Sequence, residues 1–318
     1  YNSLAHRTTW LRSDLFLFLY NICTGIFTSL GDTKTPLYFL IGSSVGNVVL
    51  DYVFVAVFGR GVGGVAWATF IAQGVACVLA LISLGKKLAG IETEKVPARF
   101  SAKMLRRITL YAVPSILQQS FVSVGNIFVQ FLVNGFGSSC IAGYSAAVKL
   151  NTFAVTSFNT LSNGLSSFTA QNYGANKPDR IKAGYKAGLV IAVIVAVPFI
   201  ICYFLFSKTF IGLFLDSGGD KALAIGSQFL RIVSPFYIAV GIKIMSDGVL
   251  RGKGAMQYFM ITTFADLILR VVLAFVLSGP YGEKGIWMSW PVGWLFSTIL
   301  SVVFAAVKLR RTDLKNME

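Results

Sequence analysis

The sequence has little charge, a single histidine and no paired cysteines, and each shortage excludes a class of protein. Lys, Arg, Asp and Glu make up 13% of the 318 residues, against about 25% in an ordinary soluble domain. A soluble globular protein and a disordered chain are therefore excluded. With His6 as the single histidine, a His-based metal or catalytic site is excluded, and we expect no metal site. The cysteines stand singly and are interpreted as small buried apolar residues: Cys23, Cys77, Cys140 and Cys202.

Apolar side chains, in contrast, make up 55% of the sequence. A helix that crosses a membrane needs about 20 consecutive apolar residues. The apolar runs here are long and continuous rather than alternating, which predicts helices and not barrel strands. The predicted fold class is therefore all-α, a polytopic membrane helix bundle. We expect nine spans, at residues 13–30, 36–58, 62–84, 108–133, 140–170, 186–207, 222–249, 256–278 and 285–307.

The net charge of +15 comes from basic residues that gather in alternate loops. If successive loops lie on opposite sides of the bilayer, eighteen Lys and Arg fall on one side and six on the other. The positive-inside rule then places the first set, and the C-terminus with it, in the cytoplasm. We expect a multi-pass protein of the plasma membrane, with the lipid bilayer and not nucleic acid as the partner of these charges. The longest such loop, residues 86–107, is interpreted as a cytoplasmic basic linker or as a merely solvated loop.

A repeat with an offset of 223 residues links the two ends of the chain. Residues 25–31 (GIFTSLG) and 248–254 (GVLRGKG) share two glycine positions, and residues 47–53 match 270–276 at four of seven positions. Repeats in the same orientation build two lobes with a substrate cavity between them. Equal lobes would require about 128 further residues, or three helices, before Tyr1. The predicted domains are residues 1–85, the C-terminal half of the first lobe with three helices; 86–107, the linker; and 108–318, a complete second lobe with six helices.

Several motifs together resemble the MATE (multidrug and toxic compound extrusion) transporters. In the first half these are GDTKTP at residues 31–36 and GNVVLDY at residues 46–52. In the second half they are QNYGA at residues 171–175 and GVLRG at residues 248–252. The resemblance extends over about residues 15–310 and depends on the motifs taken together.

This resemblance implies a two-lobe fold of twelve helices, about nine of which are in this chain. It implies a secondary active antiporter, not an enzyme, that expels small organic cations and other drugs in exchange for Na⁺ or H⁺ by alternating access. We expect no cofactor beyond that coupling ion, and a monomer. Two alternatives stay open. One is a lipid-linked or polysaccharide flippase of the same superfamily, whose cleft should carry several cations where we place mainly Lys149; the other is a non-transporting truncated product.

A membrane-embedded prenyl-transfer enzyme is excluded on its acidic residues. That chemistry needs paired Asp clusters to hold Mg²⁺ and a pyrophosphate. Asp216 and Asp220 have a suitable D-x₃-D spacing, but a second cluster is missing from the sequence.

Asn47 and Asp51 form the first candidate for cation coupling. They stand four residues apart within a predicted span, so they share a helix face. An amide and a carboxylate on one face can coordinate an ion or hold a proton. The alternative is that Asp51 lies near the outer end of its span and pairs with Arg60.

Charges inside a membrane span are expensive and mark functional candidates, and three of those in the predicted spans are singled out here. Asp266 and Arg270 are four residues apart and are interpreted first as an intrahelical ion pair. Lys243 lies in the middle of its span without an obvious local partner. Either it snorkels or pairs with an acid elsewhere, or it stands in for the charge of a coupling ion. The cation-coupling candidates are therefore Asn47, Asp51, Lys243, Asp266 and Arg270.

The span at residues 140–170 is the most polar one, and the preceding span adds several amides. Hydrocarbon cannot satisfy so many polar groups, so they either join helices to one another or line a water-filled cleft. Three tryptophans near one end of the last span, Trp287, Trp290 and Trp294, fit an interfacial belt. The predicted substrate-cleft residues are Gln118, Gln119, Asn126, Gln130, Tyr144, Lys149, Asn151, Asn159 and Asn163.

Overall fold

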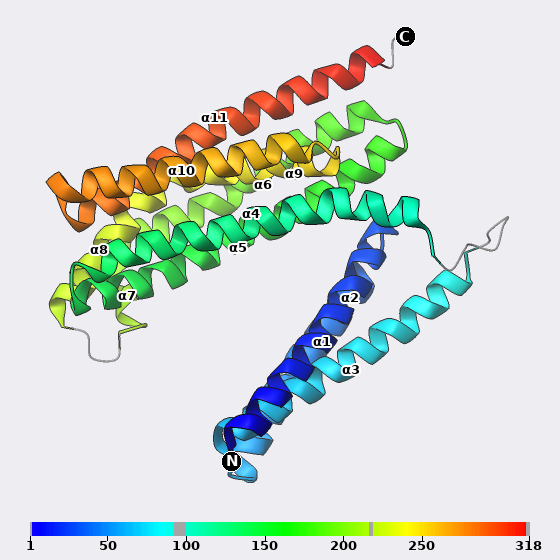
Figure 1. Cartoon of the computed structure of the whole chain (residues 1–318), viewed down its shortest axis with the longest axis horizontal. Coiled ribbons are helices and arrows are strands. Elements are labelled where there is room, and N and C mark those ends of the chain that lie inside the picture. Colours follow the sequence, from blue (N-terminus) through cyan, green and yellow to red (C-terminus); the bar gives the residue numbers. More distant parts are fainter. Residues whose placement is uncertain (1, 92–99, 216–218, 316–318) are drawn as a thin grey trace. The chain divides into compact units, whose positions relative to one another are not determined.

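A computed structural model describes residues 2–91, 100–215 and 219–315, with side chains described from residue 14 to residue 310. Among these residues the chain folds into helices and contains no strand, as predicted. It divides into two compact units, residues 1–99 and 100–318, each of which is described by itself (Figure 1).

The first unit consists of three long helices. These are α1 (Asn2–Ser29), α2 (Lys34–Tyr52) with a π-helical extension over Val53–Val57, and α3 (Gly61–Ala89). Helix α3 packs against both α1 and α2, which touch each other little. A row of alanines on α3 is buried, and small side chains let helices approach closely in a membrane. The buried alanines are Ala66, Ala68, Ala72, Ala76 and Ala80.

The loop between α1 and α2 is tied to the end of α3 by one carboxylate. Asp32 accepts hydrogen bonds from the backbone N–H of Thr35 at 3.1 Å and from its hydroxyl at 2.9 Å. It also forms an ion pair with Lys87 in the last turn of α3. The Lys87 ammonium, followed by the two Thr35 donors, lowers the pKa of Asp32 to about 2. The GDTKTP motif is thus a structural clamp.

The second unit contains the remaining helices, which pack into one bundle. Helix α5 packs against α6, α8 and α9, and α10 packs against α11 and α4. One predicted span, residues 222–249, is broken where Pro235 ends a helix and starts a 3₁₀ turn. The elements are α4 (Ala102–Asn134), α5 (Ser138–Gly174), α6 (Pro178–Leu205), α7 (Ser207–Gly212), α8 (Asp220–Val233), the 3₁₀ turn Ser234–Phe236, α9 (Tyr237–Gly252), α10 (Met256–Tyr281) and α11 (Glu283–Lys315).

Aromatic rings fill the core of the second unit. Tyr144 stacks on Trp287 at 5.0 Å between ring centroids, and Phe229 meets the edges of Trp287 and Trp290 at 5.2 and 5.5 Å. Trp287, Trp290 and Trp294 are at most 6% exposed. The predicted interfacial belt is therefore wrong, because these rings face inward to the helices of the unit.

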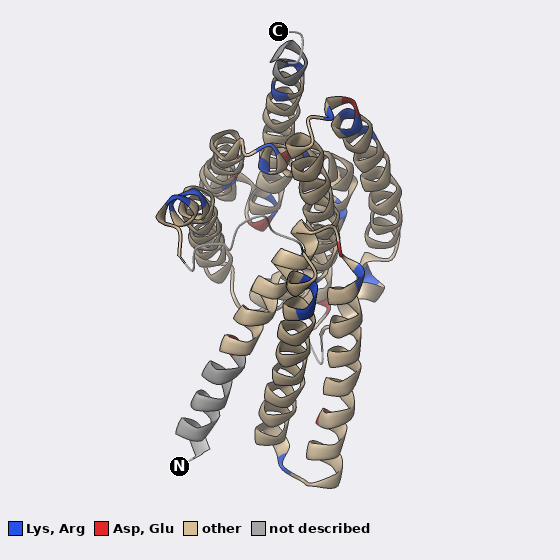
Figure 2. Cartoon of the chain, turned by 90° about the vertical axis from the view of Figure 1, so that its right-hand side faces the viewer, with Lys and Arg blue, Asp and Glu red and all other residues tan. Residues whose placement is uncertain are grey.

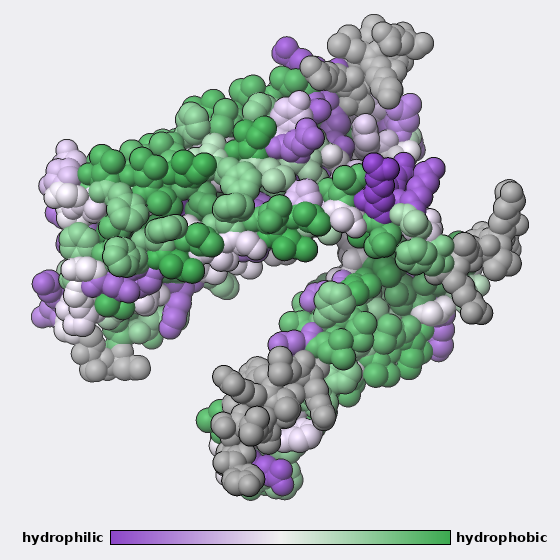
Figure 3. Space-filling model, in the orientation of Figure 1, coloured by the Kyte–Doolittle hydropathy of each residue, from purple (hydrophilic) through white to green (hydrophobic). Residues whose placement is uncertain are grey.

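Every predicted span corresponds to one helix, or to a broken pair, among the described residues. Seven of these helical segments are long and apolar enough to cross a membrane. Figure 2 shows that Lys, Arg, Asp and Glu occupy little of the helical ribbon, and in Figure 3 apolar residues dominate the visible surface of each unit. In the predicted linker, α3 runs to Ala89 and α4 starts at Ala102, so its ends are helical; residues 92–99 lie outside the described residues.

The repeat predicted from the sequence is reflected in the backbone. At the offset of 223 residues, Gly31 with φ +82° corresponds to Gly254 with φ +71°, and Gly59 with φ +64° corresponds to Gly282 with φ +60°. A positive φ costs other residues energy, so both connections need glycine. Helices α2 and α3, shifted by the same offset, fall within a few residues of the bounds of α10 and α11. These agreements support a duplication.

Candidate functional site

A cavity of about 620 Å³ lies within the second unit. Its walls come from α4, α5, α9, α10 and α11. Pockets that bind small molecules usually measure about 300–1,000 Å³. The cavity is therefore large enough for a drug-sized molecule.

Amide side chains form the wall contributed by α4 and α5. On α4 the lining residues recur at three- or four-residue spacing, which places them on one helix face. Asn126, Asn159 and Asn163 are exposed, so the cavity is open on the side of this wall. Asn151, in contrast, is buried and accepts a hydrogen bond from the Tyr237 hydroxyl at 3.1 Å. Eight of the predicted cleft residues line the cavity: Gln118, Gln119, Asn126, Gln130, Tyr144, Asn151, Asn159 and Asn163.

Lys149, the ninth predicted cleft residue, does not line the cavity. Its side chain is exposed, and its ammonium lies 5.8 Å from the centroid of the Phe214 ring. Thr152 and Thr156, three and seven residues further along the same face of α5, do line the cavity. The position of the Lys149 ammonium beside Phe214, and not its helix face, therefore separates it from the cavity.

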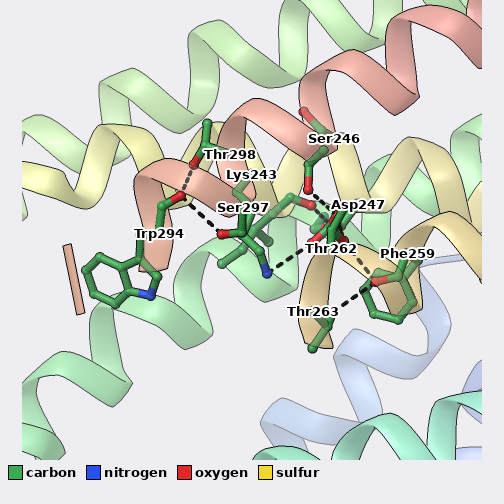
Figure 4. Close-up of polar contacts among 12 residues, drawn as sticks. Lys243, Ser246, Asp247, Phe259, Thr262, Thr263, Trp294, Ser297 and Thr298 are labelled. Carbon is green, nitrogen blue, oxygen red and sulfur yellow. Dashed lines mark hydrogen bonds and ion pairs between the residues drawn. The ribbon is translucent and has the colours of Figure 1, made fainter. Parts of the chain in front are cut away.

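The inner wall of the cavity carries a buried ion pair. The Lys243 ammonium lies 3.2 Å from a carboxylate oxygen of Asp247, one turn further along α9. Asp247 is 3% exposed and also accepts hydrogen bonds from Thr262 at 3.1 Å and Ser301 at 2.7 Å. Figure 4 shows Lys243, Thr262 and Asp247 converging on this point. The prediction that Lys243 has no local partner is wrong. The sequence does carry a signal for this pair, because Asp247 stands four residues later on the same helix face.

Asp266 and Arg270 line the same cavity but form no ion pair with each other among the described contacts. The Arg270 guanidinium lies 4.4 Å from the centroid of the Trp290 ring instead. One Asp266 oxygen, Oδ1, faces the backbone of α11, where a Cβ on Gly293 would lie 2.7 Å from it. Asp266 Oδ1 and Arg270 Nε are buried without a hydrogen-bond partner in the described structure. The predicted intrahelical pair is therefore wrong, because α11 holds both groups.

A third basic residue, Arg251, completes the charged wall. Its guanidinium donates a hydrogen bond to Ser162 at 2.9 Å and lies 5.3 Å from the centroid of the Phe259 ring. The cavity is thus lined by three basic and two acidic side chains. Trp290 and Trp294 are four residues apart, a spacing that signals a shared helix face. The charged and aromatic lining residues that the sequence analysis did not place in the cavity are Asp247, Arg251, Phe259, Trp290 and Trp294.

The first unit has a smaller cavity of about 170 Å³ between its three helices. Asn47 lines it and donates a long hydrogen bond, 3.5 Å, to Thr69, whereas Asp51 does not line it. No ion pair joins Asp51 to Arg60 among the described residues, and Asp51 Oδ1 is buried without a hydrogen-bond partner there. The alternative pairing of Asp51 with Arg60 is thus not formed among the described residues, and Asn47 and Asp51 do not both line this cavity.

The described residues contain no group of three or more His, Cys, Asp or Glu side chains that could hold a metal ion. The Asp216–Asp220 spacing cannot be compared, because residue 216 lies outside the described residues.

The family model MatE matches residues 114–276, which is just over half of the chain and includes most of the larger cavity. The chain belongs to the MatE family. It is 27% identical over 292 residues to the probable multidrug resistance protein YpnP of Bacillus subtilis (strain 168), covering 91% of this chain and 64% of the relative. It is 28% identical over 295 residues to the probable multidrug resistance protein YoeA of the same organism, covering 90% and 63%. The chain therefore spans less than two thirds of the length of these relatives.

The fold also matches a crystal structure of MATE in the bent conformation. That match has a TM-score of 0.86 and 20% sequence identity, and it covers 98% of this chain and 70% of the other. At this identity the likeness shows the fold alone. The MatE chain is thus a multi-pass membrane protein with a MATE transporter fold.

Proposed function

We propose that this MatE chain serves multidrug efflux, as a secondary active antiporter that works by alternating access. The proposed cargo is small organic cations and other drugs, exchanged for Na⁺ or H⁺ across the plasma membrane. The observation that carries the proposal is the 620 Å³ cavity, with amides on one wall and charges on another. Charged side chains inside a membrane are costly and mark pathways for substrates and ions.

The proposed topology follows from the basic residues. The C-terminus and the linker between the units lie in the cytoplasm, where Lys and Arg are retained. The two units are proposed to be parts of two lobes that rock against each other, as expected for repeats in the same orientation. We expect the protein to act as a monomer and to catalyse no covalent step.

Asp266 is the carboxylate that we propose for coupling in the second unit. Asp247 is already neutralised by Lys243 and two hydroxyl donors. Asp266 Oδ1, in contrast, has no hydrogen-bond partner among the described residues. A proton or Na⁺ on Asp266 would remove the negative charge that a cationic drug contacts, and this competition exchanges one for the other. In the first unit Asn47 and Asp51 remain candidates.

Ethidium, a fluorescent organic cation, tests the proposal. We expect the chain in lipid nanodiscs to bind ethidium, and Asp266→Asn to weaken binding about tenfold, the effect of losing one contact to a charged group. Lys149→Gln, outside the cavity, is the matched control and should leave affinity unchanged. Equal affinity in wild type and Asp266→Asn would contradict the role of Asp266. Binding without ethidium efflux from cells would favour the non-transporting alternative.

A second candidate function is the flippase, and one observation favours it. Lys243, Arg251 and Arg270 all line the cavity, whereas the sequence placed mainly Lys149 there. Several basic side chains suit a pyrophosphate-linked lipid. Tight binding of a polyprenyl pyrophosphate, with no binding of ethidium, would favour this function over drug efflux.

A further inference from the structure

Basic and aromatic side chains meet at one end of the second unit. The Lys253 ammonium lies 5.6 Å from the centroid of the Tyr173 ring and donates a hydrogen bond to the backbone carbonyl of Lys308. The Lys308 ammonium in turn lies 4.4 Å from the centroid of the Tyr258 ring. These contacts bring together the end of α5, the turn between α9 and α10, the start of α10 and the C-terminal part of α11.

Helix α4 adds more positive charge at the same place. Gly254, in the turn between α9 and α10, lies so close to α4 that a Cβ on it would be 2.9 Å from the Tyr111 hydroxyl. Arg107 stands one turn before Tyr111, so it projects from the same face of α4. Arg107 is exposed, as are Lys103 and Arg106. We define the basic corner as Arg107, Lys253 and Lys308 together with Tyr111, Tyr173 and Tyr258.

The segments that build the basic corner carry positive charge of one sign only. Residues 102–134 of α4 contain no Asp or Glu, and neither do residues 248–257 around the turn between α9 and α10. Basic side chains at the end of membrane-spanning helices attract the anionic headgroups of lipids. The tyrosine rings beside the two lysines hold the ammonium groups in place, and tyrosine hydroxyls can donate hydrogen bonds to a phosphate.

Apolar side chains beside these charges favour a lipid over a soluble phosphate. Met104, Leu105 and Ile108 are 51–57% exposed and lie on the same turns of α4 as its basic residues. Figure 3 shows hydrophilic residues gathered where α4 begins, with apolar surface along the rest of the second unit. A soluble phosphate would contact the charges alone. A phospholipid would also lay its acyl chains along the apolar side chains of α4.

We propose that the basic corner binds the headgroup of an anionic phospholipid. The Arg107 guanidinium donates paired hydrogen bonds to the phosphate, and Lys253 and Lys308 supply further positive charge. The lipid thereby joins α4 to α10 and α11, helices that also form walls of the larger cavity. This inference goes beyond the proposed function, because it concerns the surface of the second unit and not its cargo.

Native mass spectrometry of the chain in detergent tests the inference by counting bound lipids. The probes are dioleoyl-phosphatidylglycerol and dioleoyl-phosphatidylcholine, which share their acyl chains and a phosphate but differ in net charge. We expect the first phosphatidylglycerol to bind about tenfold more tightly than the first phosphatidylcholine. The double variant Arg107→Gln with Lys253→Gln should remove this preference. Arg107→Lys with Lys253→Arg keeps both charges and should retain most of it.

The matched control is Arg180→Gln with Lys186→Gln, which removes two exposed positive charges from α6, a helix that packs mainly against α5 and α9. The control should leave the preference unchanged. Equal affinity for the two lipids in wild type overturns the inference. Loss of the preference in the control also overturns it, because total charge and not the basic corner would then explain the binding. If glycerol 3-phosphate, which has no acyl chains, binds as tightly as phosphatidylglycerol, the site takes soluble phosphates and the inference is wrong.

Discussion

The two ends of the chain, α1–α3 in the first unit and α9–α11 in the second, share a scaffold but not a chemistry. At the offset of 223 residues, the six cavity-lining residues of α1 and α2 correspond to cavity-lining residues of the second unit, whereas the four on α3 do not. The corresponding pairs are Leu17 and Val240, Tyr20 and Lys243, Leu40 and Thr263, Ser43 and Asp266, Ser44 and Leu267, and Asn47 and Arg270.

The difference lies in charge. The second unit has Lys243, Asp266 and Arg270 where the first has uncharged Tyr20, Ser43 and Asn47. The backbone turns at the ends of these helices, in contrast, use glycines in the same left-handed conformation. A duplicated helix arrangement therefore fixes where side chains point, and the residue types at those points decide what the cavity can bind. Each prediction below compares one position in the second unit with its counterpart in the first.

The largest effect is expected at the ion pair. Lys243→Met removes the ion-pair partner of the buried Asp247 carboxylate, which should lower the free energy of unfolding by about 3–5 kcal/mol. The counterpart Tyr20→Phe removes one hydrogen bond, from the Tyr20 hydroxyl to the carbonyl of Pro36, and should cost about 1 kcal/mol. Denaturant unfolding in detergent micelles measures both.

The double variant Lys243→Met with Asp247→Asn is the control for this prediction. It removes the unpaired charge, so most of the lost stability should return. If Lys243→Met lowers the free energy of unfolding no more than Tyr20→Phe does, the buried charges do not make the second unit more sensitive than the first at this position.

A smaller effect is expected at the paired glycines. Gly31→Ala forces a side chain into a left-handed conformation, at a cost of about 1–2 kcal/mol. Gly254→Ala has the same strain, and its Cβ would also lie 2.9 Å from the Tyr111 hydroxyl, so it should cost more. Gly279→Ala, with open space around the added Cβ, is the control and should not destabilise the protein. Equal costs at all three positions would show that the left-handed conformation is not the reason why the two turns need glycine.

The helices of both regions could be predicted from the sequence because a membrane span needs a long apolar run. The repeat also matched Gly31 with Gly254, and the structure places both in the turns that follow corresponding helices. On α4 and α5 the amides reached the cavity as expected, since polar groups in a membrane helix must turn toward protein or water. Composition was therefore enough to place most of that wall.

The charged wall could not be predicted, because it depends on the direction in which each side chain points from its helix, and composition does not give that direction. A membrane helix is apolar almost all round, so its hydrophobic pattern does not tell which face is inside. Lys149 was expected in the cleft and faces Phe214 instead. The tryptophans were expected at the lipid interface and are buried. Asp266 and Arg270 have ion-pair spacing, but Trp290 and Gly293 come from another helix, 20 or more residues away, and keep them apart.

The smallest effect concerns a charge that the first unit has and the second lacks. Asp32 forms an ion pair with Lys87, whereas its counterpart at the offset is Ala255, which cannot. The pKa of Asp32 in the folded chain is about 2, below the usual value near 4 for the unfolded state. A lowered folded pKa stabilises the fold above the unfolded pKa, and this stability is lost as the pH falls from about 5 toward 2. Because the pair lies at the surface, the change in stability should be small and weaker at high salt.

Hydrogen exchange at the start of α2 measures this change in stability. In wild type, protection should fall between pH 5 and pH 3, after correction for the intrinsic exchange rate. In Asp32→Asn protection should be low at both pH values, and at the start of α10 it should not change over this range. An equal acid-induced loss at both helix starts would show that the clamp does not distinguish the two regions.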